Sequence, residues 1–114
     1  MNETFTSKKA DFIAEVKYFT TEEGGRKTPA FSGYRPQVKF DFTEMQTSGQ
    51  QTFLNKETAF PGDTVTVEMR IISVEYFANS LTEGMIFEIR EGARVIGTGK
   101  IISILNDTLK KASR

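Results

Sequence analysis

The sequence contains no histidine and no cysteine. Histidine is the commonest general base near neutral pH, and the two residue types together supply the usual ligands of zinc. A thiol nucleophile is excluded as well. None of the seven serines has a lysine three residues later, so the Ser-x-x-Lys arrangement of some hydrolases is also absent. We therefore expect a protein that is not an enzyme, needs no metal or other cofactor, and works by binding.

Neither sign of charge is in excess, because 15 Lys and Arg residues balance 15 Asp and Glu residues. Zero net charge argues against a protein that binds polyanions over its whole surface, so any nucleic-acid site has to be a local patch. No apolar run approaches the roughly 18 residues of a membrane span. The first ten residues are polar, unlike a secretory signal. These absences predict a cytoplasmic protein with no membrane partner.

Two short motifs suggest chemistry, and the residues around them argue against it. Glu22 and Glu23 stand together in a glycine-rich loop, where adjacent acids usually form a solvated turn rather than a catalytic pair or a metal site. The stretch GTGK at 97–100 lacks the glycine that a phosphate-binding loop needs five residues before its Gly-Lys pair, since Arg94 occupies that position. We expect no bound nucleotide.

Alternation of apolar and polar residues predicts a protein built of strands. The clearest case is 64–71, which follows a Pro-Gly turn at 60–63 and has a period of two. Similar alternation predicts strands at 12–18, 38–43, 85–90 and 95–105, the last two joined as a hairpin by a turn at 91–94. Short apolar runs at 51–54 and 72–77 extend or add strands. The residues predicted to face the core are Phe12, Ala14, Val16, Tyr18, Val38, Phe40, Phe42, Val65, Val67, Met69, Ile71, Met85, Phe87 and Ile89.

These runs give about six strands, which predict a small closed six-stranded antiparallel β-barrel of the all-β class, because closure removes edges that promote aggregation. We expect one domain at 11–105, with flexible polar segments at 1–10 and 106–114. Polar ends of this kind favour natural termini of a free-standing domain over a cut through a longer factor. Gly97 and Gly99 lie two apart in the last strand, which predicts a bulge or a close approach of a neighbouring backbone.

The segment 20–36 is longer than most connections within a compact domain, and long loops are commonly functional or disordered. It carries the cations Arg26, Lys27 and Arg35 beside the aromatic residues Phe31 and Tyr34. We expect the aromatic side chains to pack over one end of the barrel. Arg26 and Lys27 have no local partner in the sequence. They are therefore expected to lie exposed at the loop apex and to bind a partner without contributing to folding.

Four motifs resemble, in order, segments of the C-terminal (third) domain of bacterial elongation factor Tu. They are EEGGRKTP at 22–29, GYRPQ at 33–37, FPGD at 60–63 and IREGARVIGTG at 89–99. The resemblance covers 11–105 and implies a six-stranded antiparallel barrel, in agreement with the strand pattern. In the full factor this domain follows a GTPase domain and a second barrel, and neither is present in this sequence. The resemblance therefore implies no GTP hydrolysis.

The same resemblance implies a role in translation, in which the domain contacts the T-stem of aminoacyl-tRNA, packs on a translation GTPase or receives an exchange factor. Carried over residue by residue, the T-stem contacts fall on Arg26, Gln37, Glu91 and Gly92, with Lys27 standing where the family usually has histidine. Arg26, Gln37 and Lys27 are expected to contact the phosphate and ribose backbone of the stem. Glu91 is expected to reach a base edge in the shallow minor groove of the stem.

The segment 75–83 is longer by a few residues than its counterpart in the family, and it contains Tyr76 and Phe77. Exposed aromatic residues in an insertion predict an additional contact surface. Arg35 and Arg90, which lie within the motifs that carry the resemblance, are further candidate contacts.

Two functions stay open from the sequence. One is an RNA-binding module that contacts a tRNA stem, weakly when it stands alone. The other is a protein-interaction module that engages a partner in trans through the surface that packs on the GTPase domain in the full factor. Zero net charge favours the second function, as does Ser73, which stands on a stretch where the family often has lysine.

Overall fold

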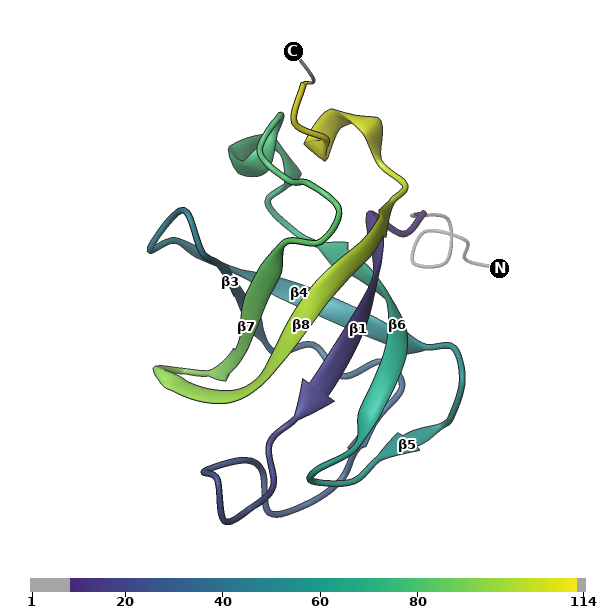
Figure 1. Ribbon diagram of the computed structural model, residues 1–114, viewed down its shortest axis with the longest axis vertical. Helices are drawn as coiled ribbons and strands as arrows, with labels where there is room; N and C mark the ends of the chain where they lie inside the picture. The colour runs from purple at the N-terminus through teal and green to yellow at the C-terminus, as the bar shows by residue number, and fades with distance from the viewer. Residues whose placement is uncertain (1–8, 113–114) are drawn as a thin grey trace, which may run out of the picture.

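The computed structural model describes residues 9–112 and shows a closed antiparallel β-barrel (Figure 1). Around the barrel, the strands follow the order β1, β6, β4, β3, β7 and β8. Their bounds are Phe12–Tyr18 for β1, Gln37–Phe40 for β3, Gln46–Phe53 for β4, Thr64–Ile71 for β6, Ile86–Glu91 for β7 and Arg94–Ile104 for β8. The predicted six-stranded closed barrel is confirmed.

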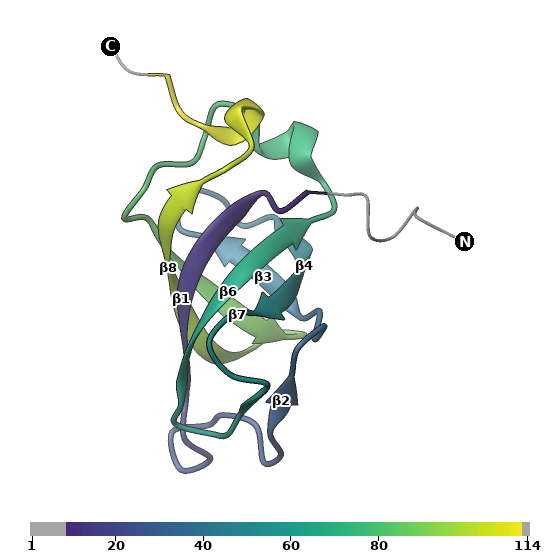
Figure 2. The same cartoon turned by 90° about the vertical axis from the view of Figure 1, so that its right-hand side faces the viewer.

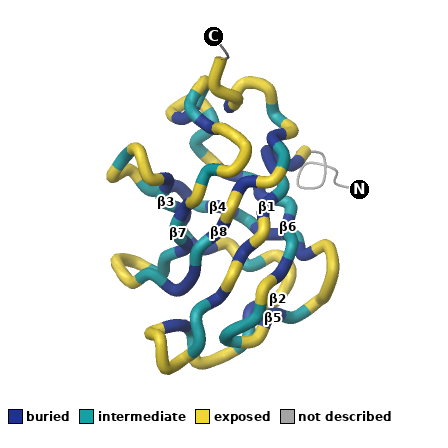
Figure 3. The backbone as a smooth tube through the Cα atoms, in the orientation of Figure 1, coloured by how far each residue is buried: buried dark blue, intermediate teal, exposed yellow. Residues whose placement is uncertain are grey.

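The barrel interior is filled by apolar residues that the alternation pattern predicted to face the core. In β6 every second residue from Val65 to Ile71 is buried, and in β1 every second residue from Phe12 to Tyr18 is buried. The ring of Phe12 packs edge-on against Phe40 and Phe87, with ring centroids 6.2 and 5.8 Å apart. The apolar faces of different strands therefore meet in one core, whose buried stretches run along the strands in Figure 3.

Two stretches that the sequence predicted as strand differ in the structure. β3 stops at Phe40 because the chain turns at Asp41, so Phe42, predicted to face the core, is 47% exposed. Its ring stacks on that of Phe40 instead, with centroids 6.0 Å apart. The stretch at 72–77, predicted as strand, contains the short 3-10 helix η1, Val74–Phe77. Phe77 packs against Phe40 with ring centroids 5.2 Å apart, so contact with the core places this helix.

One end of the barrel is closed jointly by η1, the residues after it and the C-terminal helix η2, Asp107–Leu109 (Figures 1 and 2). Leu81 and Leu109 are fully buried there. The backbone N–H of Leu81 donates to the carbonyl oxygen of Leu109 at 2.8 Å, and the N–H of Lys111 donates to that of Leu81 at 2.8 Å. Neither 3-10 helix of residues 9–112 has the length or the apolar run to cross a membrane.

The flexible tail predicted at 106–114 is wrong for residues 106–112. Leu109 is an apolar anchor within a polar segment, and its burial holds that segment against the barrel. The Asn106 side chain also caps η2 by accepting from the Thr108 N–H at 3.1 Å. The predicted flexibility of residues 1–8 and 113–114 lies outside the described residues, while Ala10 and Asp11 are already buried.

At the opposite end, the long loop after β1 forms a small two-stranded sheet with the segment between β4 and β6. β2 (Ala30–Phe31) pairs antiparallel with β5 (Thr58–Ala59), beside the main barrel (Figure 2). The loop then rejoins the barrel, because the N–H of Gly33 donates to the carbonyl oxygen of Gln51 in β4 at 2.7 Å. Phe31 is 58% exposed, so the prediction that it covers the barrel end is wrong, while Tyr34 packs against the core as predicted.

Gly97 and Gly99 permit two close approaches, of which the one at Gly97 is the predicted approach of a neighbouring backbone. A Cβ atom at Gly97 would lie 2.5 Å from the carbonyl oxygen of Lys17 in β1. A Cβ atom at Gly99 would lie 2.2 Å from the ring of Phe87 in β7. β8 is the strand that pairs with both β1 and β7, so these glycines let the barrel close around the core.

Replacing Gly97 with Ala is expected to lower the free energy of unfolding by about 1–3 kcal/mol or more, because the obstructing atom is backbone and cannot rotate away. Thr98→Val is the matched control, since its side chain lies on the outer face of the same strand, and it is expected to change stability by less than about 0.5 kcal/mol. Urea denaturation followed by circular dichroism measures both. Equal stability of the two variants would contradict the close approach.

Candidate functional site

The loop that carries the predicted cations begins with a locally closed turn. The backbone N–H of Thr20 donates to Glu23 Oε1 at 2.8 Å, and the N–H of Glu23 donates to Thr20 Oγ1 at 3.1 Å. The hydrogen bond from the Thr20 backbone N–H, followed by one from the Thr20 side chain, lowers the pKa of the Glu23 carboxyl. A Cβ atom at Gly25 would lie 2.2 Å from the carbonyl oxygen of Phe19, so only glycine fits there. The turn therefore fixes the backbone just before Arg26.

Arg26 uses every N–H group of its guanidinium within the protein. Nε donates to the carbonyl oxygen of Thr28 at 3.2 Å, and Nη2 donates to Thr28 Oγ1 at 3.1 Å and to the carbonyl oxygen of Pro29 at 3.2 Å. Nη1 donates to the hydroxyl of Tyr34 at 3.0 Å and to Glu91 Oε2 at 2.5 Å. A guanidinium has five N–H donors, so these five acceptors satisfy all of them.

Glu91 joins the loop to the hairpin of β7 and β8. Its Oε2 accepts from both Arg26 and the hydroxyl of Tyr34, and its Oε1 accepts from Arg94 Nη2 at 3.3 Å. The guanidinium carbon of Arg26 also lies 4.6 Å from the centre of the Tyr34 ring, close enough for a cation–π contact. We call Arg26, Tyr34, Glu91 and Arg94 the Arg26 cluster.

The cluster shifts the ionisation of its own members. Partial burial by itself raises the pKa of Glu91, but hydrogen bonds from Tyr34 and Arg26 and the charge of Arg26 outweigh burial and hold that pKa below its ordinary value. Burial raises the pKa of Tyr34, and its hydrogen bond to Glu91 raises it further, to about 12. Glu91 is therefore a carboxylate and Tyr34 a neutral donor over the physiological pH range.

The sheet register brings two more predicted residues to this end of the barrel. Gln37, the first residue of β3, pairs with Arg90 of β7, directly before Glu91. Gly92 follows in the hairpin turn with a positive φ of 64°, as a Gly at the first position of a tight hairpin turn commonly has. The Gln37 side chain donates to Ser48 Oγ at 3.1 Å. Strand pairing thus places Gln37, Glu91 and Gly92 beside the loop of Arg26.

The predicted cations differ in how far the protein already neutralises them. Arg90 forms an ion pair with Glu88 at 2.6 Å, on the outer face of β7. Lys27 and Arg35 are exposed, and no hydrogen bond or ion pair of either side chain is present among residues 9–112. Arg94, which the sequence did not single out, is 53% exposed and makes one long ion pair, to Glu91 at 3.3 Å.

The prediction that Arg26 lies exposed without a local partner is wrong. Its side chain is 21% exposed, and its charged partner Glu91 is 65 positions away in the sequence, where no local pattern reveals it. Tyr34 and Arg94 were missed as members of the site for the same reason. The one usable signal was the motif resemblance, which placed Arg26 and Glu91 in a common site.

Tyr76 and Phe77 do not belong to this group. They lie in η1, which closes the other end of the barrel (Figure 1). Tyr76 is 66% exposed, but Phe77 is 1% exposed and belongs to the core. The predicted contact surface of two exposed aromatic residues is therefore wrong for Phe77, because the insertion folds inward to cover the barrel end.

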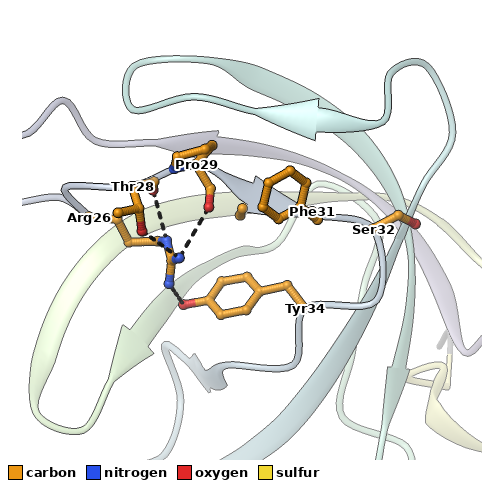
Figure 4. Close-up of a pocket in the computed structure, with 7 residues that line it drawn as sticks. Arg26, Thr28, Pro29, Phe31, Ser32 and Tyr34 are labelled. Atoms are coloured by element: carbon orange, nitrogen blue, oxygen red, sulfur yellow. Dashed lines mark hydrogen bonds between the residues drawn. The ribbon is translucent and has the colours of Figure 1, made fainter.

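A surface pocket of about 430 Å³ lies beside the Arg26 cluster (Figure 4). It is lined by Arg26, Thr28, Pro29, Ala30, Phe31, Ser32 and Tyr34. The donors of Arg26 are bonded to Thr28, Pro29 and Tyr34, which also line the pocket (Figure 4). Among residues 9–112 no group of three acidic side chains is gathered that could hold a metal ion. The arrangement can offer cations, a fixed carboxylate and exposed apolar surface to a partner.

The chain matches the model of a known protein family. The model of the family described as "Elongation factor Tu C-terminal domain" matches residues 6–105, which include every strand of the barrel and the Arg26 cluster. The match ends before η2, so the C-terminal part of the cap lies outside it.

Arg26→Ala is expected to lower the free energy of unfolding by about 2 kcal/mol, because it leaves Glu91 and Tyr34 without their partly buried partner. Lys27→Ala, the adjacent and exposed cation, is expected to change stability by less than about 0.5 kcal/mol. Thermal denaturation of both variants beside the parent separates the two residues. Two equal melting temperatures would show that the cluster does not stabilise the loop.

Stability is expected to depend on pH through Glu91. Because folding lowers the pKa of this carboxyl, its contribution is complete above the ordinary pKa of glutamate and is lost as the pH falls through the lowered value. Glu91→Gln removes this contribution. The gap in melting temperature between parent and Glu91→Gln should therefore be widest near pH 7 and shrink toward pH 3. A gap that stays constant between pH 7 and pH 3 would exclude the linkage.

Proposed function

Because the chain belongs to the elongation factor Tu C-terminal domain family and is a translation-related module, we propose that it binds the backbone of a duplex RNA stem, such as the T-stem of tRNA. The barrel of this family is non-catalytic, and the GTPase activity of the full factor lies in another domain. The observation that carries the proposal is the ion pair between Arg26 and Glu91. It joins the loop that holds Arg26 and Lys27 to the hairpin that holds Glu91 and Gly92. Gln37, the first residue of β3, pairs with Arg90 beside that hairpin, and these five residues occupy the positions of the T-stem contacts that the resemblance implies.

The charges at this end suit a phosphate backbone in spite of the zero net charge of the chain. Lys27 and Arg35 are exposed cations without an ion pair among residues 9–112, and Arg94 is only partly neutralised by Glu91. Lys27 and Arg35 lie in the 20–36 loop and Arg94 begins β8, so the loop and the hairpin together offer three cations to a short duplex segment. Binding through so few phosphates is expected to be weak and dependent on salt.

The shape of this end suits the minor groove of RNA. The minor groove of an A-form helix is wide and shallow, so a protein reaches it with projecting turns rather than with an inserted helix. Here the β7–β8 hairpin and the loop after β1 both extend from the same end of the barrel (Figure 1). The carboxylate of Glu91 lies at the base of the hairpin turn, and its position is fixed by Arg26 and Tyr34.

A protein partner is the second candidate, and exposed apolar residues favour it. Phe31 and Phe60 are 58% and 56% exposed beside the small β2–β5 sheet, and Ile86 and Ile102 are each 49% exposed on the outer face of β7 and β8. Exposed apolar groups of this size are typical of surfaces that pack on another protein. In this alternative the chain engages a translation GTPase or an exchange factor and no RNA.

The RNA proposal is tested by fluorescence anisotropy with a labelled tRNA T-stem hairpin titrated from low to physiological salt. Three phosphate contacts predict a slope of log affinity against log salt of about −2 to −3. The control variant Lys110→Ala/Lys111→Ala removes two exposed cations near the opposite end of the barrel and should leave the affinity and the slope unchanged. Absence of binding at any salt concentration would reject the RNA proposal and leave the protein partner.

A further inference from the structure

Resting on the proposed RNA-binding function, we propose that Arg26 does not touch the RNA in this chain. Arg26 is instead a positioning residue that holds Glu91 and the loop, and the phosphates are contacted by Lys27 and Arg94. The family match brings Arg26 to attention as a contact, and the hydrogen bonds of its side chain assign it a different role. This division of labour makes Arg94 a further contact residue.

The donors of Arg26 decide its role. Each of the five N–H groups of its guanidinium already has an acceptor, two of them backbone carbonyl oxygens and one a carboxylate oxygen. A phosphate could bind Arg26 only by displacing one of these acceptors. Displacing Glu91 would leave a carboxylate without its main counter-ion next to a phosphate, which repels it. Contact between Arg26 and phosphate is therefore disfavoured by the geometry of the free protein.

The neighbours of Arg26 have the freedom that it lacks. Lys27 is the next residue in the loop, is exposed, and has no hydrogen-bonded or charged partner among residues 9–112. Arg94 is 53% exposed, and within residues 9–112 only one of its nitrogens is bonded, to Glu91 Oε1 at 3.3 Å. That bond holds the Arg94 guanidinium beside Glu91 and leaves its other N–H groups for a phosphate.

Tyr34 makes the positioning specific. Its hydroxyl accepts from Arg26 Nη1 at 3.0 Å and donates to Glu91 Oε2, and its ring lies under the guanidinium. The Tyr34 backbone is anchored too, because its carbonyl oxygen accepts from the N–H of Gln51 in β4 at 2.9 Å. Movement of the loop relative to β4 would thus break the contacts that fix Glu91. Loss of the Tyr34 hydroxyl should therefore weaken RNA binding, as should loss of the forked hydrogen bonds of the Arg26 guanidinium.

The experiment measures the affinity and the salt slope of T-stem hairpin binding for four variants beside the parent. Lys27→Ala and Arg94→Ala should each make the slope shallower by about one unit, because each removes one phosphate contact. Arg26→Lys keeps the charge but loses the forked hydrogen bonds, so it should bind roughly tenfold more weakly with the slope of the parent. Tyr34→Phe, which is the mildest change to the fold, should behave like Arg26→Lys.

Phe31→Ala is the matched control within the same loop, since Phe31 is exposed and forms no part of the Arg26 cluster. It should leave the slope unchanged and show that disturbance of the loop alone does not alter the phosphate contacts. Circular dichroism at the binding temperature establishes that each variant is folded.

Three results overturn the proposal, and they are distinguishable. If the parent binds the hairpin and Arg26→Lys binds as tightly as the parent, Arg26 acts as a point charge on phosphate and only this inference fails. If the parent binds and Arg94→Ala leaves the slope unchanged, Arg94 does not contact a phosphate, and again only this inference fails. If the parent itself does not bind the hairpin at any salt concentration, the proposed function fails together with the inference.

Discussion

The ion pair between Arg26 and Glu91 is the interaction on which the functional end of this barrel depends. Arg26 lies in the loop after β1, and Glu91 lies in the β7–β8 hairpin. At the Arg26 cluster these two segments are joined by this partly buried side-chain contact of 2.5 Å and not by strand pairing. The turn at Thr20 to Glu23 and the close packing of Gly25 set the position of Arg26. The register of β7 against β3 and β8 sets that of Glu91. The pair connects two supports that are each already rigid.

The two ends of the barrel are stabilised by different physical interactions. At the cap, the rings of Phe40 and Phe77 meet edge-on and the buried Leu109 brings the C-terminal segment onto the barrel, so burial of apolar surface dominates. At the other end the interior becomes polar, because the Tyr18 hydroxyl donates to Gln51 Oε1 at 2.7 Å beneath the Arg26 cluster. The Tyr18–Gln51 hydrogen bond fixes these two side chains relative to each other, while Gln51 Nε2 is buried without a hydrogen-bond partner among residues 9–112.

The surfaces of this chain differ in whether their cations are paired with carboxylates, rather than in how many cations they carry. Arg26 and Arg90 each lie within 2.6 Å of a carboxylate oxygen, whereas Lys27 and Arg35 are exposed without such a partner among residues 9–112. A count of cations treats all four alike. The field that a partner meets comes from the uncompensated ones, and for this reason a chain with zero net charge can still carry a basic patch.

The sequence by itself determined the barrel: alternation in 12–18 and 64–71 identified the buried faces, because a strand exposes every second side chain to the same environment. It also determined the close approach at Gly97, since glycine alone lacks a Cβ atom. Only the tertiary structure decided that Arg26 is held by Glu91, that Phe77 faces inward and that Leu109 anchors the C-terminal segment. Each of these depends on partners distant along the chain, and a local pattern reports the periodicity of one segment but carries no information about which distant segment lies against it.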